Sequence, residues 1–238
     1  MATRNFLYKS EIVINDFVSI RIPSVGEIIE CEDAYYNLVQ LLTAMPVDLM
    51  VALDDVGIDF STINDYDLFI ITFNAIKQCD TRLIFGDLDL SAFEFAVDEA
   101  TGRPVMLDTK TDRKFDRALQ VNIAETLRKI HHLEKNNRKP GNEEARKYMI
   151  ERARKKMNRN RRRTHSSQLE DLIVAMVNTE QYKYDFAGTL ELSIYQFNES
   201  VRQITHKINY SNIMFGIYSG TVNPKDINQE ELNWLKHK

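Results

Sequence analysis

Apolar residues recur every three or four positions through most of this 238-residue chain, a spacing typical of amphipathic helices. The stripe formed by Leu169, Ile173 and Met176 is a clear example. Helix breakers are scarce, with five Pro and eight Gly residues, so helices should be frequent and loops short. The predicted helices span residues 33–45, 46–57, 64–78, 112–133, 167–177, 194–208 and 211–218.

Two other stretches alternate between apolar and polar residues, which is typical of β-strands. Val18, Ile20 and Ile22 alternate with polar residues and predict one strand of a hairpin, whose second strand is expected at Glu27–Cys31. A second hairpin is expected over residues 91–107. The chain is therefore predicted to be a helix-rich α+β protein, with N-terminal β-hairpins packed on helices, a basic helical arm and a C-terminal α-helical block.

Charge is distributed very unevenly along the chain. Residues 138–163 hold 12 of the 31 Lys and Arg residues and only three acids, a net charge of +9 that leaves −13 on the remainder. This asymmetry divides the chain into an α+β block (1–134), a basic linker and helix (135–165) and an α-helical block (166–238). It favours an interaction role over a catalytic one.

The basic arm is expected to form a helix from Asn142, because Glu143 and Glu144 suit the positive end of the helix dipole. Its charges could contact the phosphates of a nucleic acid, or an acidic protein surface such as the acidic remainder of this chain. Base readout is not expected, because apart from Tyr148 no aromatic residue is interleaved with the charges. The residues expected to bind are Arg154, Lys155, Lys156, Arg159, Arg161, Arg162 and Arg163.

Composition limits the remaining possibilities. Cys31 and Cys79 are too few and too far apart for a disulfide framework or paired metal ligands, and we expect both to be reduced and buried. The N-terminus lacks the apolar run of a signal peptide, and no window approaches the roughly 18 apolar residues of a membrane span. We therefore expect a cytoplasmic protein with no membrane partner.

Acidic pairs offer only weak metal sites. Asp54 with Asp55, or Asp87 with Asp89, could hold Mg²⁺ through carboxylate oxygens. No Gly-rich phosphate loop accompanies them, and spacing alone is a poor indicator. We expect no metal and no cofactor.

Catalytic patterns are also incomplete. Asp108 and Lys110 resemble half of a nuclease site, but the first acid is not identifiable, and a polar turn before a helix capped by Asp112 is favoured. His131 and His132 lie at a predicted helix end without a third metal ligand. No strand-turn-helix context places a Ser nucleophile. We therefore expect no enzyme.

Segments spread over most of the chain carry a family resemblance. They are IRIPSVGEI (20–28), MPVDLMVALDDVGIDF (45–60), LRKIHHLEKN (127–136) with KPGNE (139–143), IERARKK (150–156), and the stretch from VNTEQYKYDF to IYSGTV (177–222). Together they resemble a family of phage and prophage proteins of Gram-positive bacteria that are encoded among tail genes and look like tail assembly chaperones. None of these segments is a ligand or catalytic signature.

The resemblance implies a non-enzymatic tail assembly protein, a chaperone that binds the tape measure protein or another tail component. A tape measure protein is long and helix-rich, so its chaperone needs apolar grooves that accept amphipathic helices. Trp234, beside Leu232 and Leu235, is expected to be an exposed anchor. A nucleic-acid-binding protein acting through residues 138–163 and a permanent virion subunit are the alternatives. The sequence leaves the oligomeric state open.

Overall fold

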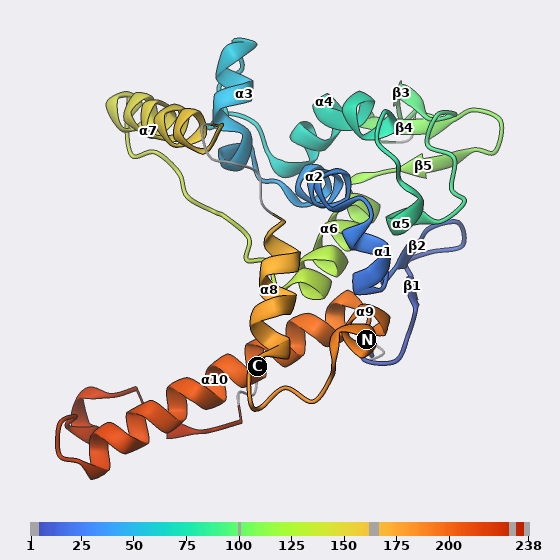
Figure 1. Cartoon of the computed structure of the whole chain (residues 1–238). Coiled ribbons are helices and arrows are strands. Elements are labelled where there is room, and N and C mark those ends of the chain that lie inside the picture. Colours follow the sequence, from blue (N-terminus) through green and yellow to red (C-terminus); the bar gives the residue numbers. More distant parts are fainter. Residues whose placement is uncertain (1–4, 100, 162–166, 229–231, 236–238) are drawn as a thin grey trace.

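The computed structural model describes residues 5–99, 101–161, 167–228 and 232–235 (Figure 1). Of these described residues 55% are helical, and they include two small antiparallel sheets, of two and three strands. This architecture confirms the predicted helix-rich α+β class.

Three helices form the centre of the body: α2 (Glu32–Thr43), α4 (Asp65–Lys77) and α6 (Arg117–His131). Each buries a set of apolar residues. The buried residues include Tyr35, Leu38, Val39 and Leu42 in α2, Leu68, Phe69 and Phe73 in α4, and Leu119, Ile123, Leu127 and Ile130 in α6. Burial of one such side chain contributes about 1.5–3 kcal/mol, so these stripes dominate the stability of the body.

The N-terminal hairpin pairs β1 (Glu11–Val13) antiparallel with β2 (Ser19–Arg21). The strand predicted after β2 is wrong, because α1 (Val25–Ile29) takes its place. Ser24 Oγ accepts a hydrogen bond from the Glu27 N–H, and the Glu27 carboxylate accepts one from the Ser24 N–H. This capping box starts a helix directly after the strand.

The second predicted hairpin is confirmed, and it belongs to a three-stranded sheet of β3 (Glu94–Val97), β4 (Pro104–Asp108) and β5 (Arg113–Phe115). The short helix α5 (Arg82–Phe85) precedes the sheet. Strand β5 was not predicted.

Because β5 intervenes, the helix expected to start at Asp112 starts later. Asp112 lies in the turn before β5 with a φ of 53°, and Asp116 caps α6 by accepting the Leu119 N–H. The predicted start of this helix is therefore four residues too early, because β5 occupies the residues between Asp112 and Asp116.

A second, smaller apolar cluster lies beside the central helices. It joins η1 (Pro46–Leu49) and α3 (Met50–Asp55) to α7 (Glu143–Arg161). Its buried members are Ala44, Val47, Leu53, Phe60, Leu68 and Ile150. The helix predicted from Pro46 is confirmed, with a 3-10 first turn and Gly57, at a φ of 76°, after its end.

The C-terminal part consists of α8 (Gln168–Val177), α9 (Phe186–Glu191) and α10 (Ile194–Tyr218). Helix α8 starts where predicted, with Ser167 as its N-cap, and Ser167 Oγ and the Leu169 N–H both donate to the Glu32 carboxylate on α2. Two expectations are corrected here. Helix α9 replaces a predicted loop, and the two predicted helices at 194–208 and 211–218 form one continuous helix.

A short backbone bridge fixes the start of α10 against the start of α1. The Val25 N–H donates to the Leu192 carbonyl, and the Ile194 N–H donates to the Pro23 carbonyl, both at 2.9 Å. Ser24 and Ser193, which cap the two helices, lie opposite each other in this bridge. Ile194, Phe197 and the buried face of α8 join the same core as the N-terminal residues.

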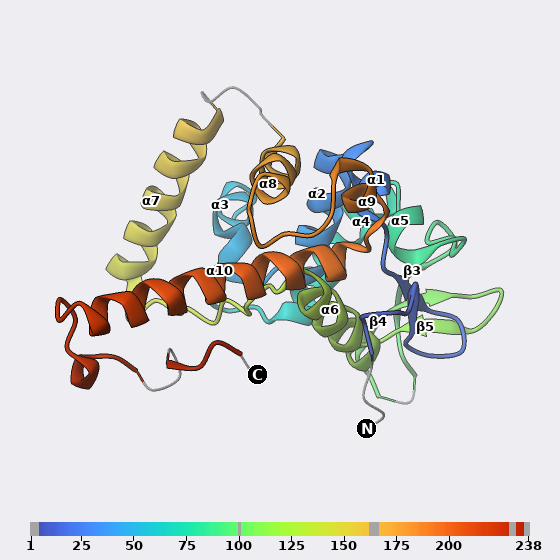
Figure 2. The same cartoon turned by 60° about the horizontal axis from the view of Figure 1, so that its bottom comes forward.

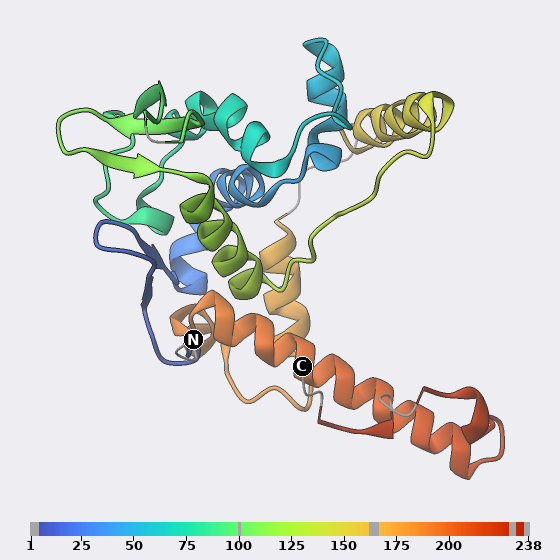
Figure 3. The same ribbon diagram turned by 180° about the vertical axis from the view of Figure 1, so that it is seen from behind.

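Two helices project from the body (Figures 1 and 3). Helix α7 lies against α3, and we call it the α7 arm. Helix α10 starts at the body and runs well beyond it, and the following segment, with the short η2 (Pro224–Asp226), lies beside its far end (Figure 2). We call residues 208–228 the α10 tip.

Candidate partner-binding surfaces

The α7 arm is anchored by one buried residue. Ile150 is 6% exposed and lies in the second cluster with Leu53 and Phe60, while Met149 packs at its edge. In contrast, Tyr148 is 63% exposed on the other side of the helix. A helix that is polar nearly all round thus has a single firm apolar contact.

Ion pairs reinforce this anchor on the same face of α7. Arg146 lies 3.5 Å from Asp59, and Arg154 lies 3.0 Å from Asp54 and 2.7 Å from Asp55. Arg146, Ile150 and Arg154 are spaced by four residues, so all three face α3 and the loop after it. One acidic surface that meets the basic arm is therefore the chain's own α3.

Three of the four acids considered as metal ligands have other structural roles. Asp54 and Asp55 share the Arg154 guanidinium, and Asp89 accepts a hydrogen bond from the Ser91 N–H. Within the described ranges, no group of three or more His, Cys, Asp or Glu residues could hold a metal ion.

The half-motif at Asp108 forms a turn. Its carboxylate accepts hydrogen bonds from Thr111 Oγ1 at 2.6 Å and the Lys110 N–H at 2.9 Å, and these bonds lower the pKa of Asp108. A carboxylate held this way stabilises the connection between β4 and β5.

The predicted basic site residues fall into three groups. Arg154 is committed to α3, and Lys155 pairs with Glu151 at 2.6 Å along the helix. Lys156 and Arg159 are exposed, and no ion pair of theirs occurs within the described part of the chain. Arg161 is the last residue of α7, but its side chain lies outside the described residues, as do Arg162 and Arg163 altogether.

A groove of about 1430 Å³ runs between α7 and the segment formed by η1 and α3. Its apolar lining comes from both sides, with Val47, Leu49 and Met50 facing Met149 and Met157. Cationic residues also line it, namely Arg138, Arg152, Lys155, Lys156 and Arg159, together with one acid, Asp48. We call this the α3–α7 groove.

Sequence reasoning missed the groove and its residue Arg152. The groove is built from two segments about a hundred positions apart, so no local pattern contains it. The available signal was Met149, Ala153 and Met157, whose four-residue spacing forms a narrow apolar line along an otherwise charged helix.

The α10 tip presents large apolar side chains to solvent. Phe215 is 75% exposed and Tyr218 is 81% exposed. On the opposite side Gly216 is buried, because the returning segment packs on it so closely that a Cβ there would lie 2.6 Å from Val222 Cγ2. One side of the tip is thus covered by its own chain and the other carries exposed aromatic rings.

Trp234 lies next to the middle of α10. Its carbonyl accepts a hydrogen bond from Gln203 Nε2 at 2.9 Å, and its side chain is 50% exposed. The neighbouring Asn233 carbonyl is bonded to His206 Nε2 at 2.6 Å. An anchor role for Trp234 stays a prediction, but the ring is accessible.

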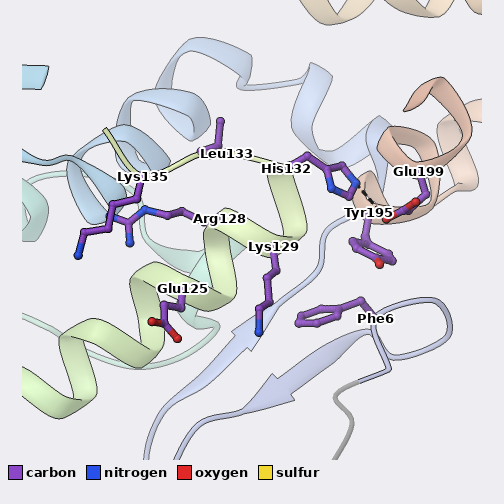
Figure 4. Close-up of a pocket in the computed structure, with 9 residues that line it drawn as sticks. All are labelled: Phe6, Glu125, Arg128, Lys129, His132, Leu133, Lys135, Tyr195 and Glu199. Carbon is purple, nitrogen blue, oxygen red and sulfur yellow. Dashed lines mark ion pairs between the residues drawn. The ribbon is translucent and has the colours of Figure 1, made fainter. Parts of the chain in front are cut away.

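A smaller space of about 450 Å³ lies at the joint between α6 and α10, and Figure 4 shows the side chains around it. Three cations line it, but two of these have internal partners, since Arg128 donates to the Thr43 carbonyl and Lys135 lies 3.0 Å from Asp65. The space therefore belongs to a structural joint.

The two histidines at the end of α6 also serve this joint. His132 adopts a φ of 53° and lies 3.3 Å from the Glu199 carboxylate on α10. His131 is bonded to the Tyr35 hydroxyl at 2.9 Å, and burial lowers its pKa to about 4. A His with that pKa is neutral at pH 7 and acts as a packing residue.

The cysteines differ from expectation. Both are free, but Cys31 is exposed and Cys79 is partly exposed, so their predicted burial is wrong. Among the described helices, none is long and apolar enough to cross a membrane.

These features define a class of helix-rich α+β protein with two projecting helical arms. Residues 158–238 match the family model described as the YomV second domain. That family is phage-derived, from a Bacillus prophage, so the match is consistent with a phage protein. The match covers roughly a third of the chain and includes α8, α9 and α10. No curated protein and no solved structure matches the chain.

Proposed function

We propose that this is a non-enzymatic phage protein that binds another protein during tail assembly, as a chaperone of the tape measure protein or of another tail component. The α10 tip is the observation that carries the proposal. Exposed aromatic residues such as Phe215 and Tyr218 are costly to leave in water and are typical of binding hot spots. The tip lies inside the segment that matches the phage-derived family, which supports a phage role for it.

Coexpression with the tape measure protein of the same phage or prophage tests the proposal. We expect the wild-type protein to keep the tape measure protein soluble and Phe215→Ser/Tyr218→Ser to lose most of that effect. Tyr8→Ser is the matched control, because Tyr8 is 77% exposed but lies far from the tip in the sequence. Equal solubility of the tape measure protein without this chain would overturn the chaperone role.

The same preparation separates the alternatives. A permanent virion subunit would be found in purified particles at a fixed copy number, whereas a chaperone would be absent from them. A nucleic-acid-binding protein would bind duplex DNA through exposed cations such as Lys156 and Arg159, with an affinity that falls steeply with salt.

A further inference from the structure

We propose that the α3–α7 groove is a second binding site, and that its occupant is an amphipathic helix with acidic flanks. The proposal does not depend on the α10 tip or on tail assembly. It rests on the shape of the groove, its apolar lining and the charge around that lining.

The shape suits one helix. The α7 wall of the groove runs from Tyr148 to Arg159, which spans about 16 Å at the rise of an α-helix. The facing wall is η1 with the first turn of α3, where Val47, Leu49 and Met50 lie. Two helical walls with apolar side chains between them form the kind of groove that accepts the apolar face of a third helix.

The charge selects an acidic occupant. Five cationic residues line the groove against one acid, and that acid, Asp48, already accepts hydrogen bonds from the Met45 N–H and Asn136 Nδ2. Arg146 and Arg154, which do pair with the chain's own acids, point to α3 instead. The anchoring cations and the groove cations of α7 therefore lie on different faces of the helix. Of the groove cations, Lys155 pairs with Glu151 on α7 itself, which leaves Arg138, Arg152, Lys156 and Arg159 to meet a ligand.

The apolar lining favours a helix over nucleic acid. Phosphate binding needs only the cations, whereas methionine side chains such as Met149 and Met157 adapt to apolar faces of differing shape. Exposed aromatic residues for base stacking are limited to Tyr148 among the groove residues. The combination of apolar and cationic lining matches a ligand that carries both chemistries on one surface.

Binding of labelled synthetic peptides to the full chain tests the site. The probe is an 18-residue amphipathic helix of about five turns, with Leu along one face and Glu along both flanks. Its controls are the same helix with Lys in place of Glu, a scrambled acidic peptide, and duplex DNA. We expect the acidic amphipathic helix to bind best and to retain part of its affinity at high salt, because the apolar contacts are not screened.

Matched variants test whether the peptide binds in the α3–α7 groove. Arg152→Gln/Lys156→Gln should weaken the acidic helix about tenfold, the loss expected for two partly exposed charge contacts. Lys147→Gln/Lys183→Gln removes the same charge outside the groove and should leave binding unchanged. Met157→Gln should lower the affinity that remains at high salt, and Phe215→Ser/Tyr218→Ser should have no effect.

Four outcomes would overturn the proposal. They are equal binding of the scrambled peptide, preference for DNA, equal loss in both double variants, and a dimer in the ultracentrifuge that Arg152→Gln/Lys156→Gln dissociates. The last result would make the occupant a second copy of this chain. Because none of these measurements uses the tape measure protein, failure here leaves the α10 proposal standing, and the reverse also holds.

Discussion

The two arms reverse what their sequences suggest. Helix α7 is charged on nearly every side, yet it is attached to the body through Ile150 and two sets of ion pairs. Helix α10 has a regular apolar stripe, yet that stripe packs on the main core only as far as Ile204 among the described residues, and the tip beyond it carries exposed rings at Phe215 and Tyr218. The comparison shows that one well-placed apolar residue can anchor a polar helix. It also shows that an amphipathic stripe can extend beyond the surface on which it packs.

The largest expected effect is on the anchor of the α7 arm. Ile150→Ala should destabilise the attachment of α7 by about 2–3 kcal/mol, because it removes buried volume from a small cluster. Hydrogen exchange of the α7 amides measures this opening directly. Tyr148→Ala, at an exposed position of the same helix, should change stability by less than about 0.5 kcal/mol. Equal exchange in both variants would mean that the ion pairs alone hold the arm.

The next effect is the loss of stability of the body, which carries both arms, at acidic pH. His131 has a pKa of about 4 in the folded protein, below its ordinary value of 6.5, so the unfolded chain binds a proton first as the pH falls. The contribution of neutral His131 to the free energy of unfolding is fully present above pH 6.5 and is lost as the pH falls towards 4. Allowing for partial exposure of the ring, we expect a loss of roughly 2 kcal/mol. Chemical denaturation at several pH values measures it.

The control for this pH dependence is His131→Gln, which keeps a polar group near the Tyr35 hydroxyl but does not titrate. Its stability should change less between pH 6.5 and 4 than that of the wild type. An unchanged slope would assign the acid sensitivity to other groups.

A smaller effect is expected at the α10 tip. Gly216→Ala should push Val222 away from the helix, because a Cβ would approach it to 2.6 Å. The net change in stability should stay below about 1 kcal/mol, since better helix propensity offsets the overpacking. Proteolysis of residues 221–228 should nevertheless become faster. Ser211→Ala, at an exposed position of α10, is the control. If residues 221–228 were cleaved equally fast in both variants, the close approach of Val222 to Gly216 would be unimportant.

The smallest effect is expected from the ion pairs of the α7 arm. Arg154→Gln removes the contacts with Asp54 and Asp55, but this cluster is solvent-exposed and screened by salt. Exchange of the α7 amides should rise slightly at low salt and not at all at high salt. A loss as large as that of Ile150→Ala would contradict the view that the apolar residue is the main anchor.

Local signals predicted the ends of several elements correctly. Asn64 caps the helix for which Asn64 or Asp65 is the expected cap, Ser167 caps the one expected to start at Ser166 or Ser167, and Pro46 opens a helix as predicted. Each of these residues acts on backbone groups within a single turn. The errors have local causes too. Ser24 forms a capping box and starts a helix where the second strand of the hairpin is predicted, and Asp116 rather than Asp112 caps α6.

The site could not be predicted to the same degree. Nothing near Val47 in the sequence indicates that it lines a groove with Met157, since that arrangement depends on how Ile150 packs α7 against α3. Likewise, the exposure of Phe215 depends on where the body ends, and the periodicity of α10 is the same on both sides of that point. Tertiary geometry decided both surfaces.

The bridge between Ser24 and Ser193 shows that the family-matched segment and the folded body have different boundaries. The family-matched segment begins at residue 158, but the first turn of α10 is hydrogen-bonded to residues 23–25, and Phe197 is buried in a core shared with the N-terminal helices. A ribosome releases this segment after residues 11–29, so the N-terminal hairpin and α1 can already be formed when α10 packs against them. The family-matched segment without residues 23–25 would still carry the aromatic residues of the α10 tip. It would lack the backbone bridge that sets the orientation of α10.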